Sequence, residues 1–176
     1  MPGIDENKRF VPINIAVMTV TDTRNLDTDT SGKILLERIS EAGHKVADRA
    51  LVKDDVPVIV ARLTEWINSP AVDVIITNGG TGLTGRDVTP EAFAQVCHKE
   101  IPGFGELFRW ISYSSIGSST IQSRATAGVA NGTYLFALPG STGAVKDGWD
   151  NILVKQLDAR HSPCNFVELI PRLKEG

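Results

Sequence analysis

The sequence has only two cysteines, Cys97 and Cys164, and it has no CxxC pair and no histidine at the spacing of a zinc site. These absences argue against a disulfide framework and against a cysteine-based metal site. Each cysteine is expected to be a small buried hydrophobic residue. Basic runs are also absent, and 18 basic against 21 acidic side chains give a formal net charge of −3. A broad nucleic-acid-binding surface is therefore not expected.

Long apolar runs are missing as well. No segment approaches the ~20 apolar residues that cross a bilayer, and the start, MPGIDENKRFVPINIAV, lacks the basic and apolar regions of an export signal. We therefore expect a cytoplasmic protein without membrane association. The 176 residues, 41% of them hydrophobic, suit a single domain spanning 1–176, with residues 1–12 as a flexible N-terminal arm.

Short apolar runs alternate with amphipathic segments along the chain. Strands are expected at 13–20, 45–52, 72–78 and 132–138, and helices at 31–43, 56–69, from about 90, after 102, and at 141–157. Residues 112–132 are rich in Ser, Thr and Gly and are expected to form a loop with short ordered pieces. Strands separated by helices predict an α/β fold of three layers, in which helices cover both faces of a mostly parallel sheet.

Three loops follow predicted strands: TDTRN at 21–25, GGTGLTGRD at 79–87 and PGSTG at 139–143. In an open parallel sheet, ligands bind beyond the carboxyl ends of the strands, so these loops are the expected rim of a site. The last two are rich in glycine and lead toward helices. Free backbone N–H groups and a helix start suit a phosphate.

The central loop matches neither of two known phosphate-binding patterns. Gly80 and Gly85 have the spacing of a Walker loop, but Arg86 replaces its lysine and Asp87 replaces its Ser or Thr. The glycines also have the letters of a dinucleotide fingerprint. However, Thr89 followed by proline marks a helix start beyond the third glycine rather than through it.

Two acidic positions and one threonine have competing interpretations. Threonine before proline favours Thr89 as the N-cap of the next helix, whereas for Asp87 a capping role and a functional role are balanced. In LVKDD, Asp55 is better placed than Asp54 to cap the helix that follows. Asp54 is then left without a structural task.

Three motifs in order carry a family resemblance: TNGGTGLTGRDVTPEA, SRATAGVANGTYLFALPGST and NILVKQLDARHSPCNF. Together they resemble the MoaB/Mog family of molybdenum cofactor biosynthesis proteins, over the chain from about residue 13 to its end. QLDAR and PCNF place the resemblance closest to the MoaB branch. It implies a molybdopterin-binding α/β fold, a homotrimer or a dimer of trimers, and transient contact with other enzymes of the same pathway.

The resemblance also implies a reaction. Molybdopterin, a pterin dithiolene with a phosphate, would be adenylylated by ATP with Mg²⁺ and release pyrophosphate. Asp54 and Asp87 match two family aspartates, which makes them the expected catalytic residues and metal ligands. A carboxylate beside phosphate is repulsive unless a cation lies between them. Alternatively, either aspartate accepts hydrogen bonds from the pterin.

Further positions on the same motifs are expected to bind substrate. Glycine amides and a threonine hydroxyl suit phosphate, although the same glycines suit a tight turn. An arginine suits bidentate phosphate binding, although a solvated loop arginine is more frequent. The expected binding residues are Asp22, Gly79, Gly80, Thr81, Gly82, Thr89, Pro90, Glu91, Ser123, Arg124, Pro139, Gly140 and Ser141.

Three functions remain open at this point: a molybdopterin adenylyltransferase, a non-catalytic molybdopterin-binding protein of the same pathway, and a generic nucleotide-binding α/β protein. Retention of Asp54 and Asp87 favours the enzyme. For assembly, the segment IPGFGELFRWISYSSIG offers more apolar surface than one face of a short helix needs. The residues concerned are Phe104, Leu107, Phe108, Trp110 and Ile111.

Overall fold

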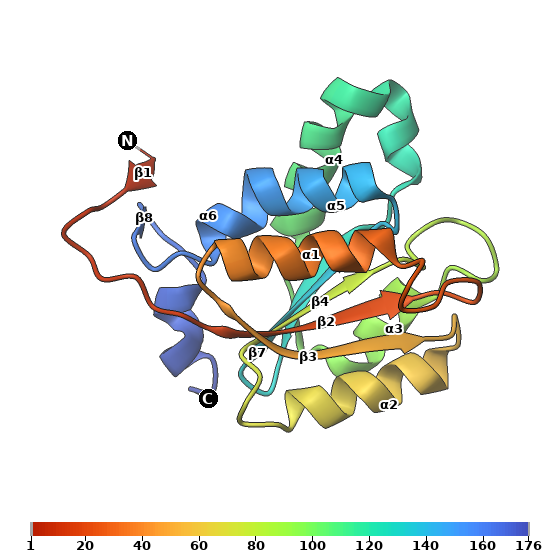
Figure 1. The fold of residues 1–176 in the computed structure, drawn as a ribbon, viewed down its shortest axis with the longest axis horizontal. Helices are drawn as coiled ribbons and strands as arrows, with labels where there is room; N and C mark the ends of the chain where they lie inside the picture. Colours follow the sequence, from red (N-terminus) through yellow and green to blue (C-terminus); the bar gives the residue numbers. More distant parts are fainter. Residues whose placement is uncertain (1, 176) are drawn as a thin grey trace.

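Six strands form the central sheet of the computed structural model, which describes residues 2–175 (Figure 1). Their order is β3 (Lys45–Val52), β2 (Asn14–Val20), β4 (Val74–Asn78), β7 (Thr133–Leu138), β6 (Thr126–Ala130) and β5 (Lys99–Glu100). The first four are mutually parallel, and β6 and β5 are antiparallel to their neighbours. The predicted mostly parallel sheet is confirmed.

Helices cover both faces of this sheet (Figure 1). On β2, Ile15 and Val17 pack with α1 (Thr30–Glu41), α4 (Pro102–Ile116) and α5 (Thr142–Gly148). Ala16 and Met18 alternate with them and pack with α2 (Val56–Ile67) and α3 (Thr89–Val96) on the other face. The inner strands β2, β4 and β7 are thus buried on both faces, which explains their largely apolar sequences, whereas the edge strand β3 is exposed over its first half. The predicted three-layer α/β arrangement is confirmed.

Local sequence signals set several helix boundaries as predicted. Asp55 caps α2 by accepting a hydrogen bond from the Val58 amide at 3.1 Å. Ser141 caps α5 by accepting from the Ala144 amide at 3.2 Å. Gly43 follows α1 with φ +87°, the left-handed conformation that ends helices. After α5 the same helical run continues as a π-helical turn, Trp149–Leu153, and α6, Val154–Gln156.

The prediction of a loop at 112–132 is wrong for most of this segment. Helix α4 continues to Ile116, a 3-10 helix spans Gly117–Gln122, and β6 follows. The β6 sequence, TAGVA, has weak strand preference, and its conformation is set by pairing with β7 and β5 on either side. Gly128 permits a close approach there, because a Cβ atom would lie 2.6 Å from the Cys97 sulfur.

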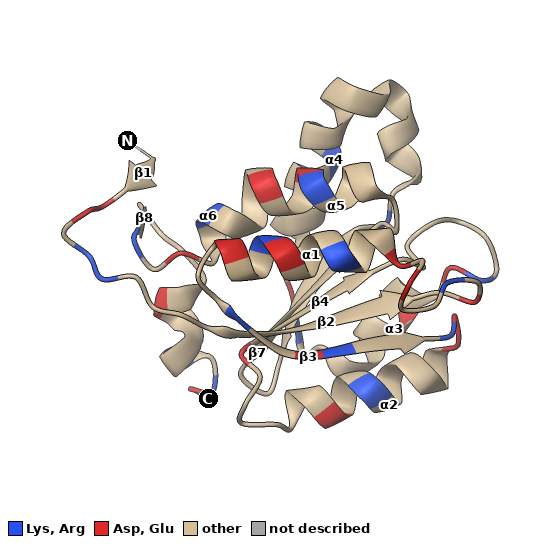
Figure 2. Cartoon of the chain, viewed as in Figure 1, with Lys and Arg blue, Asp and Glu red and all other residues tan. Residues whose placement is uncertain are grey.

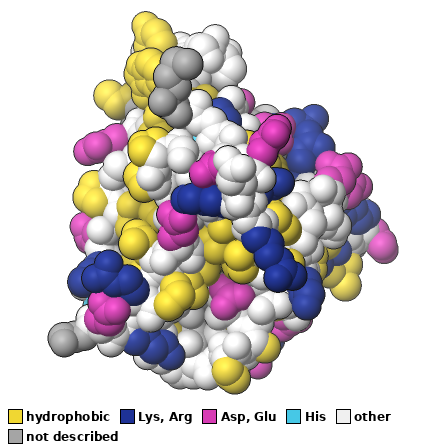
Figure 3. Space-filling model, turned by 90° about the vertical axis from the view of Figure 1, so that its left-hand side faces the viewer, with side chains coloured by type: hydrophobic (Ala, Val, Ile, Leu, Met, Phe, Trp, Pro, Cys, Tyr) yellow, Lys and Arg dark blue, Asp and Glu magenta, His cyan; other side chains and the backbone are white. Residues whose placement is uncertain are grey.

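The two ends of the described chain lie on the same side of the molecule (Figure 1). There, β1 (Gly3–Ile4) pairs with β8 (His161–Ser162), and a 3-10 helix, Val167–Arg172, packs against the core. Figure 3 shows this side, on which hydrophobic, acidic and basic side chains are intermixed. Cys164 is exposed, so its expected burial is wrong, whereas Cys97 is half-buried.

Charged residues of both signs also meet in the loops beyond the carboxyl ends of β2 and β3, on the opposite side from the termini (Figure 2). Within residues 2–175, no helix combines the length and the apolar character that crossing a bilayer requires.

Candidate functional site

A cavity of about 720 Å³ lies beyond the carboxyl ends of β2, β4 and β7. Its wall comes from the end of β2 and the loop after it, the glycine loop after β4, the PGS segment with the start of α5, and α4 with its 3-10 extension. The structure thus brings the three predicted rim loops to one cavity. Its size lies in the range of small-molecule and cofactor sites.

Nine of the predicted site residues line this cavity: Gly79, Gly80, Thr81, Gly82, Asp87, Ser123, Pro139, Gly140 and Ser141. Six others are not among its lining residues: Asp22, Asp54, Thr89, Pro90, Glu91 and Arg124.

The glycine loop requires glycine at two positions. Gly79 and Gly80 have φ values of +96° and +67°, which side chains rarely adopt. A Cβ atom at Gly79 would also lie 2.2 Å from the carbonyl oxygen of Val20 on the neighbouring strand. The backbone of this loop can therefore approach both β2 and a ligand closely.

Thr89 fastens this loop, and the prediction that it caps α3 is wrong. It is the first residue of α3, and its N-cap position, Val88, makes no side-chain capping bond. The Thr89 hydroxyl instead donates to the Gly79 carbonyl oxygen at 2.9 Å, and its amide donates to the Gly80 carbonyl oxygen at 3.0 Å. The hydroxyl turns toward the loop because a buried carbonyl there needs a donor.

Asp87 does not cap α3 either. Its carboxylate accepts hydrogen bonds from the Thr84 amide at 2.9 Å and from the Thr84 hydroxyl at 2.7 Å. Burial favours a raised pKa for Asp87, but these hydrogen bonds outweigh it and hold the pKa below the ordinary value of aspartate. Asp87 is therefore an ionised carboxylate at the cavity wall. A Cβ atom at Gly82 would lie 2.8 Å from its Oδ2.

Asp54 is half-buried next to the glycine loop. A Cβ atom at Gly80 would lie 3.2 Å from Asp54 Oδ1. Burial raises the pKa of Asp54, and the nearby negative charges of Asp22 and Asp87 raise it further, against the opposing effect of Arg86. Because Asp55 caps α2, the carboxylate of Asp54 has no capping role.

Asp22, in the loop after β2, bonds both to the glycine loop after β4 and to the loop after β3. Its carboxylate pairs with the Arg86 guanidinium, with Arg86 Nε 2.8 Å from Oδ2, and it accepts from the Asp54 amide at 3.3 Å. The hydrogen bond from Arg86 lowers the pKa of Asp22. Asp22 thus already has a cationic partner, whereas Asp54 and Asp87 have none at comparable range among residues 2–175.

The carboxylates of Asp54 and Asp87 fit an incomplete cation site. Hard oxygen ligands suit Mg²⁺, and a cation would relieve the repulsion that raises the pKa of Asp54. In the part of the chain that the structure describes, no three His, Cys, Asp or Glu side chains lie close enough to hold a metal by themselves. A cation here would therefore need oxygens from a ligand or from water.

Arg124 bonds to the backbone of the glycine loop without lining the cavity. Its Nε donates to the Gly82 carbonyl oxygen at 2.8 Å, a second nitrogen donates to the Asp87 carbonyl oxygen at 2.6 Å, and the guanidinium pairs with Glu91. In this structure Arg124 and Glu91 hold the backbone around Asp87 rather than line the cavity.

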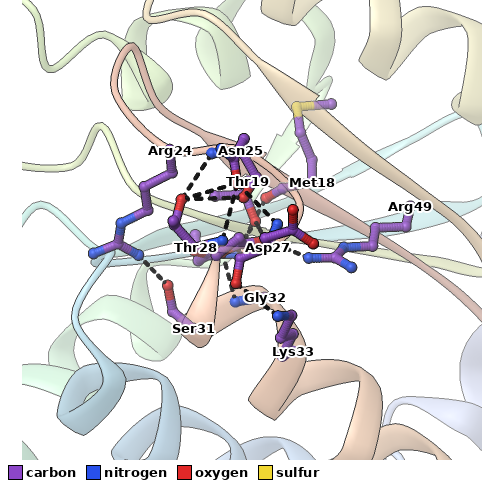
Figure 4. Close-up of polar contacts among 12 residues, drawn as sticks. Met18, Thr19, Arg24, Asn25, Asp27, Thr28, Ser31, Gly32, Lys33 and Arg49 are labelled. Atoms are coloured by element: carbon purple, nitrogen blue, oxygen red, sulfur yellow. Dashed lines mark hydrogen bonds and ion pairs between the residues drawn. The ribbon is translucent and has the colours of Figure 1, made fainter.

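Arg24 lines the cavity, although from the sequence only its loop, and not this residue, was predicted to be part of a site. One guanidinium nitrogen donates to the Ser31 hydroxyl at 2.6 Å (Figure 4). The same nitrogen donates to the Gly140 carbonyl oxygen at 3.2 Å, which links two rim loops. The sequence signal was a basic residue in a loop after a strand, which is common on any surface. Only the convergence of the loops gives Arg24 a place in the site.

The chain matches known proteins over most of its length. Residues 16–159 match the family model described as "Probable molybdopterin binding domain". Molybdenum cofactor biosynthesis protein B of Escherichia coli is 50% identical over 166 residues, which cover 94% of this chain and 96% of that protein. Its namesake in Bacillus subtilis is 42% identical over 158 residues, covering 88% and 93%.

Solved structures agree with these matches. A crystal structure of molybdenum cofactor biosynthesis protein B has a TM-score of 0.85 and 40% identity, and covers 94% of this chain and 98% of that one. The tungsten cofactor synthesizing protein MoaB from Pyrococcus furiosus has a TM-score of 0.74 and 36% identity, covering 82% and 92%. The chain therefore belongs to the MoaB/Mog family of molybdenum cofactor biosynthesis proteins, closest to its MoaB branch.

Proposed function

We propose that the protein acts in molybdenum cofactor biosynthesis by binding molybdopterin and transferring the adenylyl group of ATP to its phosphate. Family membership supports the pterin as substrate. The observation that carries the proposal is the cavity itself, where an amide-rich glycine loop and Arg24 lie near the carboxylates of Asp54 and Asp87. This combination suits two phosphate-bearing ligands and a cation.

The proposed reaction is a nucleotidyl transfer. An oxygen of the molybdopterin phosphate attacks the α-phosphorus of ATP, the bond from that phosphorus to the bridging oxygen breaks, and pyrophosphate leaves with the electron pair. The chain contributes positioning and charge. Backbone N–H groups of the glycine loop orient one phosphate, and the free donors of Arg24 attract another.

Asp54 and Asp87 would hold Mg²⁺, which when bound supplies neutralisation of the charge on the phosphates. The lowered pKa of Asp87 keeps its carboxylate ionised and ready to coordinate. The raised pKa of Asp54 reflects burial and neighbouring negative charge. Both residues would repel a triphosphate in the absence of a cation.

The test is to incubate the pure protein with molybdopterin and MgATP and to measure pyrophosphate and adenylylated pterin. We expect both products in equal amounts, and neither when the pterin is omitted. Pterin binding without pyrophosphate would replace this proposal with a non-catalytic molybdopterin-binding protein. ATP binding that is independent of the pterin and without transfer would favour a generic nucleotide-binding protein.

We also propose a cytoplasmic homo-oligomer, either a trimer or a dimer of trimers, that contacts other enzymes of the pathway transiently. Helix α4 carries two apolar faces. Phe104 and Phe108 are buried in the core, and Ile111 is half-buried. The opposite face and the 3-10 extension expose Trp110 and Ile121, whose exposed fractions are 76% and 80%. An exposed apolar patch of this kind is typical of a subunit interface.

A further inference from the structure

A chain of buried polar side chains ends at the cavity wall in Asn78. The Asn78 amide nitrogen donates to the Thr19 hydroxyl oxygen at 3.0 Å, and the Thr19 hydroxyl donates to Asp29 at 2.8 Å. Asp29 also accepts from the Gly32 amide and from Arg49, both at 2.9 Å (Figure 4).

This chain fixes which way the Asn78 amide faces. The single hydrogen of the Thr19 hydroxyl goes to Asp29, so the Thr19 oxygen accepts and the Asn78 group beside it must be the nitrogen. The carbonyl oxygen of Asn78 is then left over. Asn78 is 0% exposed and lines the cavity, and this oxygen has no hydrogen-bond partner among residues 2–175.

Ser112 presents a second unpaired oxygen among the residues that line the cavity. Its side chain lines the cavity, the residue is 3% exposed, and its hydroxyl has no partner within the described chain. Its neighbours on α4 behave differently. Ser114 donates to the Ile111 carbonyl oxygen at 2.8 Å, and Ser115 donates to the Ser112 carbonyl oxygen at 3.0 Å.

Two apolar residues flank Ser112 on α4, beside the polar Ser115, which also lines the cavity. Phe108 and Ile116 lie one turn before and one turn after it on α4, and both line the cavity. A ligand group that packs against Phe108 and Ile116 is expected to have apolar faces, and an edge that meets the Ser112 hydroxyl is expected to be polar. Buried acceptors without partners cost stability, so the missing donors are expected to come from the ligand.

We propose that Asn78 and Ser112 read the exocyclic amino group of a flat nitrogen heterocycle that packs against Phe108 and Ile116. The Asn78 oxygen accepts only, so a phosphate or carboxylate oxygen would leave it unpaired, whereas an amino group has two hydrogens to donate. This assignment rests on the proposed function, which supplies two ligands with such an amine: the pterin and the adenine of ATP.

The test measures binding of two pairs of probes, without metal or turnover, in which an oxo group replaces this amine and the neighbouring ring nitrogen gains a hydrogen. One pair is pterin and lumazine, in which an oxo group replaces the 2-amino group; the other is adenosine and inosine. Calorimetry is expected to show that the protein prefers the amine in one pair by about ten- to hundredfold. The pterin pair would assign the wall to the pterin, and the adenosine pair would assign it to the nucleotide.

Variants separate recognition from folding. Ser112→Ala removes a hydroxyl without a partner, so the melting temperature is expected to stay or rise while the preference for the amine falls at least fivefold. Ser114→Ala is the matched control on the same helix, outside the cavity, and the preference is expected to persist. Asn78→Leu is expected to abolish the preference, and Ser112→Ala keeps the test decisive if that variant does not fold.

Two results would overturn the assignment: equal affinity within both pairs, or a preference that survives in Ser112→Ala and in folded Asn78→Leu. Failure of the adenylyl transfer itself would be seen separately, as absent pyrophosphate with the amine preference intact. That outcome would remove the proposed function and leave the amine-reading wall standing.

Discussion

The hydroxyl of Thr89 donates a hydrogen bond to the carbonyl oxygen of Gly79 across 2.9 Å, and so ties the start of α3 to the glycine loop ten residues earlier. Gly79 is buried and has φ +96°, so its carbonyl has little access to water. The loop that forms the cavity wall is thus held by a side chain outside the cavity.

Thr89→Val tests this tie, because valine keeps the shape and removes the donor. The buried Gly79 carbonyl oxygen is left unsatisfied, which is expected to lower the free energy of unfolding by about 1–3 kcal/mol in urea denaturation. Thr89→Ser keeps the hydroxyl and is expected to lose about half as much or less. Equal losses in the two variants would mean that the methyl group, not the hydrogen bond, matters.

Asp87→Asn removes a negative charge from the cavity wall while an oxygen remains to accept from Thr84. We expect a normal fold and a fall in pyrophosphate release by on the order of 10²–10³, the usual effect of losing one preorganised charged group. Thr84→Val is the control. It removes one hydrogen bond to Asp87 but no charge, and its loss is expected to be about tenfold or less. A fully active Asp87→Asn protein would contradict the catalytic role.

Asp54→Asn is expected to make the protein more stable at pH 7. The pKa of Asp54 is raised, so its favourable contribution is fully present below the unfolded-state pKa and is lost as pH rises through the folded-state pKa. Asparagine carries no charge, so its stability advantage over the wild type should disappear as pH falls from above the folded-state pKa of Asp54 to below its unfolded-state pKa. Melting temperatures across this range give the comparison. Asp55→Asn, which retains a good cap, should show little change at pH 7.

The two thiols are expected to react at different rates. Burial raises the pKa of Cys97 to about 11, whereas Cys164 is exposed. Because the thiolate is the reactive form, a chromogenic disulfide reagent at pH 8 should label one thiol per chain quickly. Cys164→Ser should abolish the fast phase and Cys97→Ser should leave it intact. A fast phase that follows Cys97 instead would show that this thiol is accessible.

Light scattering tests the assembly. We expect a mass of three or six chains at micromolar concentration, and a shift to smaller species in Trp110→Glu, since a charge at an apolar interface is costly. Leu169→Glu is the matched control, because Leu169 is an exposed apolar residue on the 3-10 helix near the chain's end. A wild-type monomer would rule out the proposed oligomer.

The sequence by itself determined the features whose cause is local. The apolar run of β2, the buried stripe of α2 and the caps by Asp55 and Ser141 were all predictable. Each depends on a continuous apolar run or on helical spacing within one segment, or on a side chain that reaches a backbone amide three residues ahead. The rim loops were predictable for a related reason, because parallel strands bring their carboxyl ends to one edge.

Only the tertiary structure decided the rest. The strand β6 exists because β5 and β7 lie on either side of it, which its own small residues do not encode. Arg124 finds the Gly82 carbonyl 42 residues away, and the direction of the Asn78 amide depends on Thr19 from another strand. Such hydrogen bonds join groups that meet only after the chain has folded. Their partners therefore cannot be found from spacing along the sequence.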